Sequence, residues 1–278
     1  MLLKIFYALS ALVAVWAGFC CEGMAWLWVA PLAFAGGFLA CLILAFLFLW
    51  LLSALVDPHK EQVGDDPFYR RVIEAYAEAI SILLGMKVDV QGMEKLPQNG
   101  RFLLVCNHLS LLDVVVMVWK LRGMELTFIT KQENMRLFIA GKMMHKIQCL
   151  PLNRENDREA LKTILRCIQI LKEDKASIAV FPEGHIHKDK KLHHFRSGVF
   201  KIATKSKVPI VVCTIRDTRF VLSKLKKLQP SSVEVRLLRV IEPEEYENMT
   251  TVDLAEQIYQ TMAQDLGPDL VSREEEKA

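Results

Sequence analysis

The sequence predicts an α/β protein with a single, largely parallel mixed sheet that is flanked by helices and preceded by an N-terminal membrane-embedded helical hairpin. Two observations lead to this prediction. From Asp57 onward, short apolar runs typical of buried strands alternate with runs of helical spacing, which is the pattern of parallel strands joined by helices. Before Asp57, residues 5–21 and 23–56 carry no charged side chain, although 24% of the whole chain is charged.

The two uncharged segments are each long enough to enter a bilayer. At about 1.5 Å per residue, residues 23–56 would form a helix about 50 Å long, so it must tilt, extend beyond the hydrocarbon core of roughly 30 Å, or break, for example at Pro31. Lys4 precedes the first segment and Lys60 follows the second, and the turn between the two segments carries only the charge of Glu22. The positive-inside rule therefore predicts a hairpin whose two ends face the cytosol. A cleaved signal peptide is the competing interpretation of the first segment, but the second segment would anchor the chain anyway.

The rest of the chain divides into a linker and one α/β domain. We expect a helix over residues 68–84 at the membrane surface, a helix that starts at a capping box formed by Asn156 and Glu159, and a last helix that ends at Gly267. The expected strands cover residues 87–91, 102–106, 126–130, 147–152, 177–181, 209–215 and 232–240. The predicted division is a membrane anchor hairpin (1–56), a membrane-surface linker helix (57–85), the α/β domain (86–270) and a charged tail (271–278).

The strand expected over residues 102–106 is followed by NHLSLLD, residues 107 to 113. Ser110 and Asp113 fit a helix capping box, and on that interpretation Asp113 only starts a helix. His108, however, would lie at the carboxyl end of a strand, where α/β folds keep their functional sites. Asp113, on the first turn of the following helix, can reach its imidazole. These seven residues by themselves leave both interpretations open.

Two further expected strands end in charged side chains. Residues 177–181 are followed by PEGH, which places Glu183 and the flexible Gly184 at the same edge of the sheet. A simple turn would account for the glycine but would not require Glu183. Arg196 lies near the start of an expected helix, where a cation and free backbone amides make an anion site. Arg154 follows another strand and could bind a phosphate, unless it pairs with a neighbouring acid.

Charge and cysteine content narrow the classes of protein. The seven cysteines are odd in number and lie mostly in apolar runs, which is not typical of a disulfide framework, and no CxxC pair indicates structural zinc. The formal net charge is only +3, but basic residues cluster over 188–207 and 216–227. In a chain anchored to a bilayer, such clusters favour anionic headgroups or a phosphorylated substrate, rather than nucleic acid, as partners.

Taken in order, these blocks resemble the glycerolipid acyltransferase family typified by 1-acylglycerol-3-phosphate acyltransferase. The matching residues are Asn107, His108 and Asp113, then PLNR at 151–154, FPEG at 181–184 and VPIVV at 208–212. The resemblance covers roughly residues 85–225, about half of the chain. Four blocks in the same order are far more specific than any one of them.

The resemblance implies transfer of an acyl chain from a thioester, acyl-CoA or acyl carrier protein, to the free hydroxyl of 1-acylglycerol-3-phosphate, which forms phosphatidate. No cofactor beyond this co-substrate and no metal are implied. His108 would be the general base on the hydroxyl, and Asp113 would orient and stabilise the imidazolium. The residues implied in binding the acceptor are Asn107, Arg154, Glu183, Gly184 and Arg196. The sequence has no GxSxG elbow, so a serine acyl-enzyme is not indicated.

The chain departs from the family pattern directly after the FPEG block. The family usually has a hydroxyl residue and then arginine at these two positions, whereas this chain has His185 and Ile186. One expected ligand of the acceptor phosphate is therefore missing. Either Arg196, Lys188 or Arg154 replaces it, or the acceptor is a lysophospholipid other than lysophosphatidate.

Three hypotheses follow from the sequence. The first is a phosphatidate-forming acyltransferase, and the second is a lysophospholipid acyltransferase or transacylase with another acceptor. The third is a non-catalytic lipid-binding protein, against which the intact His108 and Asp113 pair counts. The histidines at 185, 187, 193 and 194 raise the alternative of a metal site, but without cysteine or regular ligand spacing they are more typical of a polar loop.

Overall fold

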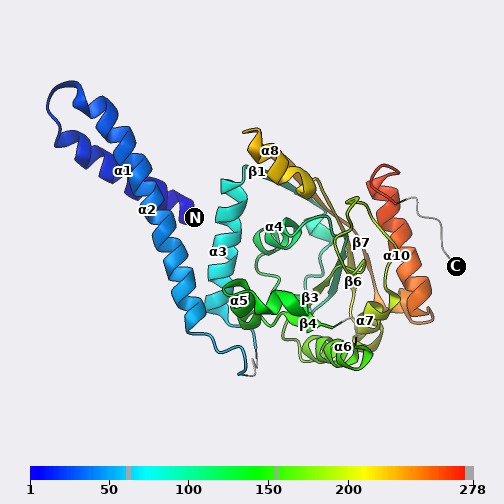
Figure 1. Ribbon diagram of the computed structural model, residues 1–278. Helices are drawn as coiled ribbons and strands as arrows, with labels where there is room; N and C mark the ends of the chain where they lie inside the picture. Colours follow the sequence, from blue (N-terminus) through cyan, green and yellow to red (C-terminus); the bar gives the residue numbers. More distant parts are fainter. Residues whose placement is uncertain (61–63, 154–155, 273–278) are drawn as a thin grey trace.

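The computed structural model describes residues 1–60, 64–153 and 156–272, which form an apolar helical hairpin and an α/β domain (Figure 1). The hairpin projects from one side of the domain, and the helix α3 (Pro67–Leu83) lies between the two. The predicted fold class, a mixed sheet flanked by helices behind a helical hairpin, is confirmed. Arg154 and the charged residues 273–278 lie outside the described residues.

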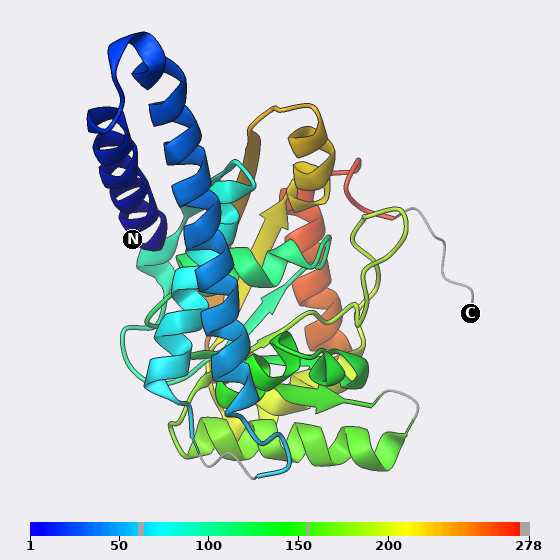
Figure 2. The ribbon, with the colours of Figure 1, turned by 60° about the vertical axis from the view of Figure 1, so that its left-hand side comes forward.

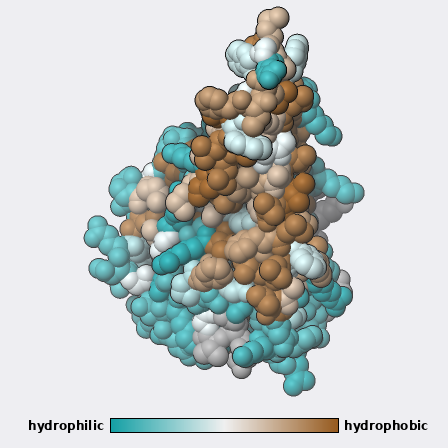
Figure 3. Space-filling view, turned by 90° about the vertical axis from the view of Figure 1, so that its left-hand side faces the viewer, coloured by the Kyte–Doolittle hydropathy of each residue, from teal (hydrophilic) through white to brown (hydrophobic). Residues whose placement is uncertain are grey.

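The hairpin consists of α1 (Leu2–Phe19), η1 (Gly23–Ala25) and α2 (Trp26–Ala54). The helices approach closely where Gly37 meets Ser10, since a Cβ at Gly37 would lie 3.4 Å from the Ser10 Cα, and the ring of Tyr7 stacks on Phe38. Both helices are long and apolar enough to cross a membrane, judged by length and composition alone. Their outward surface is almost wholly apolar, while the flanking surface of the domain is hydrophilic (Figure 3).

The great length of α2 has a structural explanation. The helix does not break at Pro31, which lies in its second turn. Its second half instead runs beside the α/β domain, where the Tyr69 hydroxyl donates to the Leu52 carbonyl oxygen over 3.2 Å and the Tyr76 hydroxyl donates to that of Ala45 over 2.5 Å. The start of α1 also packs on α3, where Leu3 and Phe6 meet Ala79, so only the rest of α1 and the first half of α2 project from the domain.

Helix α3 connects the hairpin to the domain. It begins at Pro67, and the Asp66 carboxylate caps it by accepting from the amides of Phe68 and Tyr69. One face packs on α4 (Leu112–Lys120), α5 (Ala140–Lys146) and β1 (Met86–Gln91), and the other meets the hairpin. The helix thus forms a layer between the hairpin and the domain.

Within the described residues, the sheet has seven strands in the order β1-β7-β6-β2-β5-β3-β4. The further strands are β2 (Leu103–Cys106), β3 (Leu126–Lys131), β4 (Leu150–Leu152), β5 (Ser177–Val180), β6 (Ile210–Arg216) and β7 (Ser231–Ile241). The pairs joining β6, β2, β5, β3 and β4 are parallel, and β7 is antiparallel to β6. Every expected strand is present. Strand β4 starts later than expected because Gln148 has a left-handed backbone (φ 58°), which interrupts the extended chain.

Helices cover both faces of the sheet, as Figures 1 and 2 show. Alternate residues of β2 point to opposite cores, with Leu103 and Val105 in one and Leu104 and Cys106 in the other. The remaining helices are α6 (Asp157–Lys172), α7 (Lys201–Ser206), α8 (Val221–Lys226), α9 (Pro243–Tyr246) and α10 (Thr251–Leu266). Helices α6, α7 and α10 cover the first core, and α3, α4 and α8 cover the second.

Two sequence predictions about helix ends are tested directly. Asn156 caps α6 by accepting from the amides of Arg158 and Glu159, but the Glu159 carboxylate accepts from the Asn153 amide group instead of completing a capping box. Helix α10 ends at Gly267, whose φ is 79°, as expected. The cap was therefore correct, and the reciprocal half of the box was wrong.

Candidate active site

The centre of the candidate site is the contact between His108 and Asp113. His108 follows β2 at the carboxyl edge of the sheet, and Asp113 lies in the first turn of α4. The His108 Nδ1 is 2.8 Å from the Asp113 Oδ2, while the carboxylate is fully buried and the imidazole is 13% exposed. The ring of His108 also stacks on Phe181, with centroids 4.1 Å apart. With Nδ1 held by the carboxylate, Nε2 is the nitrogen that can serve a substrate.

The Asp113 carboxylate makes contacts that belong to both of the interpretations between which the sequence could not decide. Its Oδ2 accepts from the amides of Leu109 (2.6 Å) and Ser110 (2.8 Å) as well as facing His108. The Ser110 hydroxyl, however, accepts from Leu112 rather than from the amide of Asp113. Capping and orientation therefore use the same oxygen, and the amides hold the carboxylate where the imidazole needs it.

Thr218 is a member of this cluster that sequence reasoning missed. It follows β6, at the start of η5 (Thr218–Phe220), and its buried hydroxyl donates to the Asp113 Oδ1 at 2.5 Å. The residue lies 105 positions from Asp113 in the sequence. No motif or spacing marks it, and only the neighbouring positions of β2 and β6 in the sheet bring it to the carboxylate.

Replacing Thr218 by valine should lower both stability and kcat, whereas serine should preserve both. Valine has the same shape but leaves the buried Oδ1 without its donor, and a hydrogen bond to a charged group contributes about 1.5–3 kcal/mol. Thermal unfolding and single-turnover acyl transfer on both variants test this expectation. A Thr218→Val protein with unchanged kcat would show that the Thr218 hydroxyl does not help to orient Asp113 and His108.

Glu183 links the two chain segments that flank the site. It follows β5, is 2% exposed, and accepts from the His108 amide through Oε1 (2.8 Å) and from the His193 amide through Oε2 (3.0 Å). Burial raises the pKa of Glu183 to about 8, and the two amides oppose that rise. Both carboxyl oxygens are thus occupied by backbone, so Glu183 positions His108 instead of presenting a free carboxylate to a ligand.

Glu183 should make stability fall as pH rises. The folded protein holds its proton up to about pH 8, whereas the unfolded chain releases it near 4.5, so the stabilising contribution is complete below about pH 4.5 and disappears as pH passes 8. Glu183→Gln should remove this part of the pH dependence. It should also cost about 1–3 kcal/mol, because its NH₂ group faces one of the two amide donors. Denaturant unfolding in detergent across this pH range measures both effects. Parallel curves for the wild type and the variant would contradict the assignment.

Two other predicted site residues, Asn107 and Gly184, make hydrogen bonds to the backbone. The fully buried Asn107 accepts from the Ile215 amide (2.8 Å) and donates to the Ile215 carbonyl oxygen (3.0 Å), so its side chain joins the ends of β2 and β6. Gly184 has φ 87° and closes a turn by donating its amide to the Phe181 carbonyl oxygen over 3.0 Å. Asn107 therefore supports the position of His108 from within the sheet, and a ligand could reach its amide only by displacing Ile215.

Arg196 returns the chain to the site after the loop 184–195. Its amide donates to the Pro182 carbonyl oxygen over 2.9 Å and its side chain is exposed, at the start of η4 (Ser197–Phe200). Among the predicted site residues, the structure thus gathers His108, Asp113, Asn107, Glu183, Gly184 and Arg196 at one edge of the sheet. For Arg154, which lies outside the described residues, the prediction stays a prediction.

The loop 184–195 is held by the elements around it. The His187 ring stacks on that of His193, with centroids 3.5 Å apart, and is tilted against that of His185, with centroids 4.0 Å apart. The His193 Nε2 lies 3.0 Å from the Asp189 carboxylate. Arg219 donates to the Lys190 carbonyl oxygen over 2.9 Å. Among the described residues, no group of three or more His, Cys, Asp or Glu side chains is arranged to hold a metal ion.

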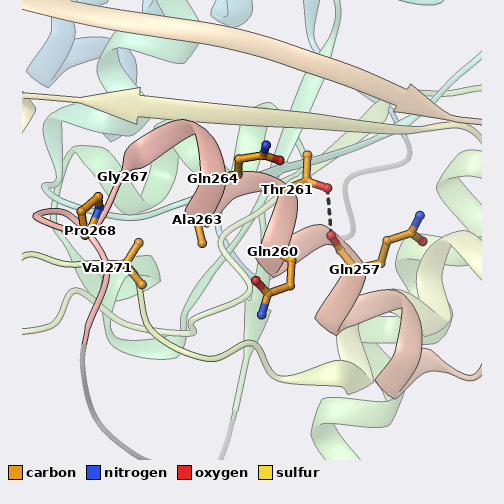
Figure 4. A pocket seen from close by; sticks show the side chains of 8 residues that line it. All are labelled: Gln257, Gln260, Thr261, Ala263, Gln264, Gly267, Pro268 and Val271. Carbon is orange, nitrogen blue, oxygen red and sulfur yellow. Dashed lines mark hydrogen bonds between the residues drawn. The ribbon is translucent and has the colours of Figure 1, made fainter.

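A shallow groove elsewhere on the domain does not belong to this site. It runs along α10, where Gln257, Gln260 and Gln264 line it and Gly267 closes one end (Figure 4). It contains none of the predicted site residues. Its polar walls include the Thr261 hydroxyl, which already donates to the Gln257 carbonyl oxygen over 2.8 Å. The candidate site is therefore defined by the contacts of His108 and not by this groove.

A histidine held by a buried carboxylate at the carboxyl edge of an α/β sheet, in a chain with an apolar helical hairpin, defines a class of protein with a candidate general base. The Acyltransferase family model matches residues 87–216. A probable 1-acyl-sn-glycerol-3-phosphate acyltransferase of Mycoplasma pneumoniae is 31% identical over 202 residues, which are 69% of this chain and 74% of that protein. The chain therefore belongs to the acyltransferase family that includes the 1-acyl-sn-glycerol-3-phosphate acyltransferases, as the resemblance of its motifs predicts.

Two further comparisons define the extent of the similarity. A chloroplastic 1-acyl-sn-glycerol-3-phosphate acyltransferase of Brassica napus is 31% identical over 186 residues, or 66% of this chain and 53% of the relative. The chain thus spans about half the length of the plant relatives that it matches. The crystal structure of the 1-acyl-sn-glycerophosphate acyltransferase PlsC from Thermotoga maritima has a TM-score of 0.59 and 21% identity, covering 95% of this chain and 97% of the other. That similarity shows a common fold.

Proposed function

We propose that this chain transfers an acyl group from a thioester to the free hydroxyl of 1-acylglycerol-3-phosphate and so forms phosphatidate. The observation that carries the proposal is the His108–Asp113 contact of 2.8 Å at the carboxyl edge of the sheet, with Nε2 available to a hydroxyl. The relatives named as acyltransferases of this acceptor support the same reaction.

The reaction needs one base and no nucleophile from the protein. The acceptor hydroxyl oxygen attacks the thioester carbonyl carbon while the His108 Nε2 takes the hydroxyl proton, and the negative charge of Asp113 stabilises the resulting imidazolium. When the carbon–sulfur bond breaks, the imidazolium returns the proton to the departing thiolate. The products are an ester and a free thiol, so the reaction balances with the thioester as the only co-substrate.

Arg196 is our candidate for binding the acceptor phosphate. Its backbone amide is held at Pro182, next to the turn that contains Glu183, and its side chain is exposed. A guanidinium can donate two parallel hydrogen bonds to a phosphate. Arg154, which ends the PLNR block, is the second candidate.

Arg196→Ala should raise the acceptor KM and leave the thioester KM nearly unchanged. A residue that holds the phosphate equally in the ground state and in the transition state contributes binding without changing kcat. Initial rates with each substrate varied in turn measure the two constants, with Arg154→Ala assayed in parallel. If both variants retain wild-type acceptor kinetics, the phosphate is held elsewhere or the acceptor has none.

We place the reaction on the cytosolic face of a membrane. The hairpin of α1 and α2 would be the anchor, since its exposed surface is apolar and the charged Lys4 and Lys60 lie toward the domain end of the two helices. An anchored enzyme would meet its lysophospholipid acceptor in the bilayer and its acyl-CoA or acyl carrier protein donor from the aqueous side.

A different lysophospholipid is the second candidate acceptor. The observation that favours it is the loop after Gly184, where stacked histidines and Ile186 stand in place of the hydroxyl residue and arginine that the family usually has. Such a loop would favour an acceptor whose phosphate carries a headgroup.

A panel of lysolipids offered to the purified protein with labelled acyl-CoA tests the proposal. Labelled phosphatidate, together with an equal amount of released thiol, is the expected result with 1-acylglycerol-3-phosphate. Labelled diacyl lipid only from an acceptor that carries a headgroup would establish the second candidate. If no thiol is released from acyl-CoA or from acyl carrier protein with any of the lysolipids, the result would favour a non-catalytic lipid-binding protein.

A further inference from the structure

The connection after β6 exposes apolar side chains that contribute nothing to the core. Phe220, Leu222 and Leu228 are exposed, while Val221 on the same short helix is fully buried. Leu228 is 92% exposed. A single exposed leucine needs no explanation, but three such residues within nine positions form a patch that water solvates poorly.

The backbone at Leu228 makes this patch more unusual. Helix α8 ends in a Schellman motif, in which the Leu228 amide donates to the Leu225 carbonyl oxygen and the Gln229 amide donates to that of Lys224. Leu228 therefore occupies the left-handed position, with φ 55°, which glycine normally fills because a side chain is unfavourable there. A large apolar side chain in an unfavourable conformation and in water stabilises nothing within the chain, and this combination motivates a functional hypothesis.

The patch lies near the end of α3, the helix that also contacts the hairpin. Ile80, Ile82 and Leu83 are exposed on the last turns of α3, and Pro230, two residues after Leu228, lies next to Gly85. These three exposed residues of α3 thus lie between the patch and the place where α1 meets α3, at Ala79 and the N-terminus. In both ribbon views, α8 lies at the end of the domain toward which the free end of the hairpin extends (Figures 1 and 2).

Positive charge accompanies the patch. Lys224, Lys226 and Lys227 lie on α8 and at its end, and two of them are exposed. Apolar side chains interspersed with lysines fit the interfacial region of a bilayer, where the apolar groups enter the acyl boundary and the ammonium groups meet anionic headgroups. The carboxyl edge that carries His108 faces the same end, because α8 directly follows β6.

We propose that α8 and the last turns of α3 form a second membrane-contact surface, which binds anionic headgroups and sets the carboxyl edge of the sheet against the bilayer. The proposal rests on the proposed anchoring of the hairpin. We call these residues the α3–α8 shoulder: Ile80, Ile82, Leu83, Phe220, Leu222, Lys224, Lys226, Lys227 and Leu228. The hairpin holds the protein in the membrane, and the shoulder fixes the orientation in which a lipid acceptor reaches His108.

Three single-site fluorescent labels on the full chain test this contact. An environment-sensitive dye is attached at Cys20 in the hairpin turn, at Leu222→Cys in the shoulder, or at Leu165→Cys on α6. In the protein labelled at Cys20, Cys21 and Cys41 are replaced by serine. In the other two proteins, Cys20, Cys21 and Cys41 are all replaced by serine. The four remaining cysteines are buried. Leu165 is a matched control because it is 55% exposed and Leu222 is 56% exposed.

The labelled proteins are placed in vesicles of phosphatidylcholine with phosphatidylglycerol that carry a lipid-bound quencher. We expect blue-shifted, quenched emission from position 222 and aqueous emission from position 165. Equal aqueous emission from 222 and 165, with a quenched label at Cys20, would overturn the shoulder while leaving the anchor intact. An aqueous label at Cys20 would instead contradict the proposed anchoring. A shift at 222 that disappears when the protein is diluted in lipid would indicate a second copy of the chain and would also overturn the proposal.

Two charge variants test the functional consequence. Lys226→Gln with Lys227→Gln should lower acyl transfer to a lysolipid in anionic vesicles several-fold and leave the rate in uncharged detergent micelles unchanged. The matched control is Lys162→Gln with Lys172→Gln, which removes two exposed charges from α6. Leu228→Gly should weaken the contact in the same way without lowering the melting temperature, because glycine suits the left-handed position. Equal rates for the shoulder and control variants in anionic vesicles would overturn the proposal.

Discussion

Replacing His108 by alanine should lower kcat by about 10²-fold to 10⁴-fold, which is the usual contribution of a positioned general base. The protein should remain folded and membrane-bound, because the imidazole is held by one carboxylate and one aromatic ring and contributes little to either core. Single-turnover acyl transfer on the purified variant measures the loss. Its melting temperature and its recovery in the membrane fraction are the controls.

The same experiment can contradict the proposed chemistry. A folded His108→Ala protein that keeps wild-type kcat would show that the acceptor hydroxyl loses its proton to another group. A variant that does not fold would not answer the question, so His108→Gln is the second substitution. Glutamine can still donate to the Asp113 carboxylate, but it is not a base, and it should lose activity to the same extent.

Asp113→Asn should lower kcat by about 10²-fold or more while costing on the order of 1 kcal/mol of stability or less. The asparagine oxygen can keep the three donors that now face Oδ2, and its NH₂ group can donate to the Thr218 hydroxyl, which rotates to accept. The packing is therefore retained. The negative charge that stabilises the His108 imidazolium is lost, and that loss falls on the transition state.

Asp113→Ala is the matched control for the capping role of this residue. Alanine leaves the buried amides of Leu109 and Ser110 without an acceptor, and each buried unsatisfied group costs about 1–3 kcal/mol. The alanine variant should thus be both inactive and clearly destabilised, whereas the asparagine variant should only be inactive. An asparagine variant that is destabilised but fully active would show that Asp113 only caps the helix and does not assist His108.

Much of the fold could be predicted because local patterns carry it. The uncharged segments before Asp57 predict two apolar helices, and the alternation of short apolar runs with helical ones predicts the strands and crossovers of the domain. Asn156 marks a helix start, and the structure has it as the cap of α6. The later start of β4 could not be predicted, because Gln148 adopts a left-handed conformation that nothing about a glutamine in the sequence indicates.

The long α2 helix shows a second limit of sequence reasoning. Its apolar length exceeds the bilayer core, and the sequence could not say whether it tilts, extends or breaks. The structure decides the question through Tyr69 and Tyr76, whose hydroxyls reach carbonyl oxygens of α2 from α3. Those contacts place the second half of the helix against the domain, and they depend on packing between segments rather than on the composition of either one.

The sequence by itself determined which residues are the candidates for the chemistry. His108 with Asp113 five positions later, and Glu183 after the strand expected over residues 177–181, follow from motifs in which every residue is near its strand in the chain. The tertiary structure alone decided what each side chain does. It gave Asp113 a capping and an orienting role through one oxygen, turned Glu183 and Asn107 toward backbone groups, and brought Thr218 to the carboxylate. The physical reason is that strand order in the sheet places β2 between β5 and β6, so the decisive contacts join residues that are far apart in the sequence and leave no local pattern in it.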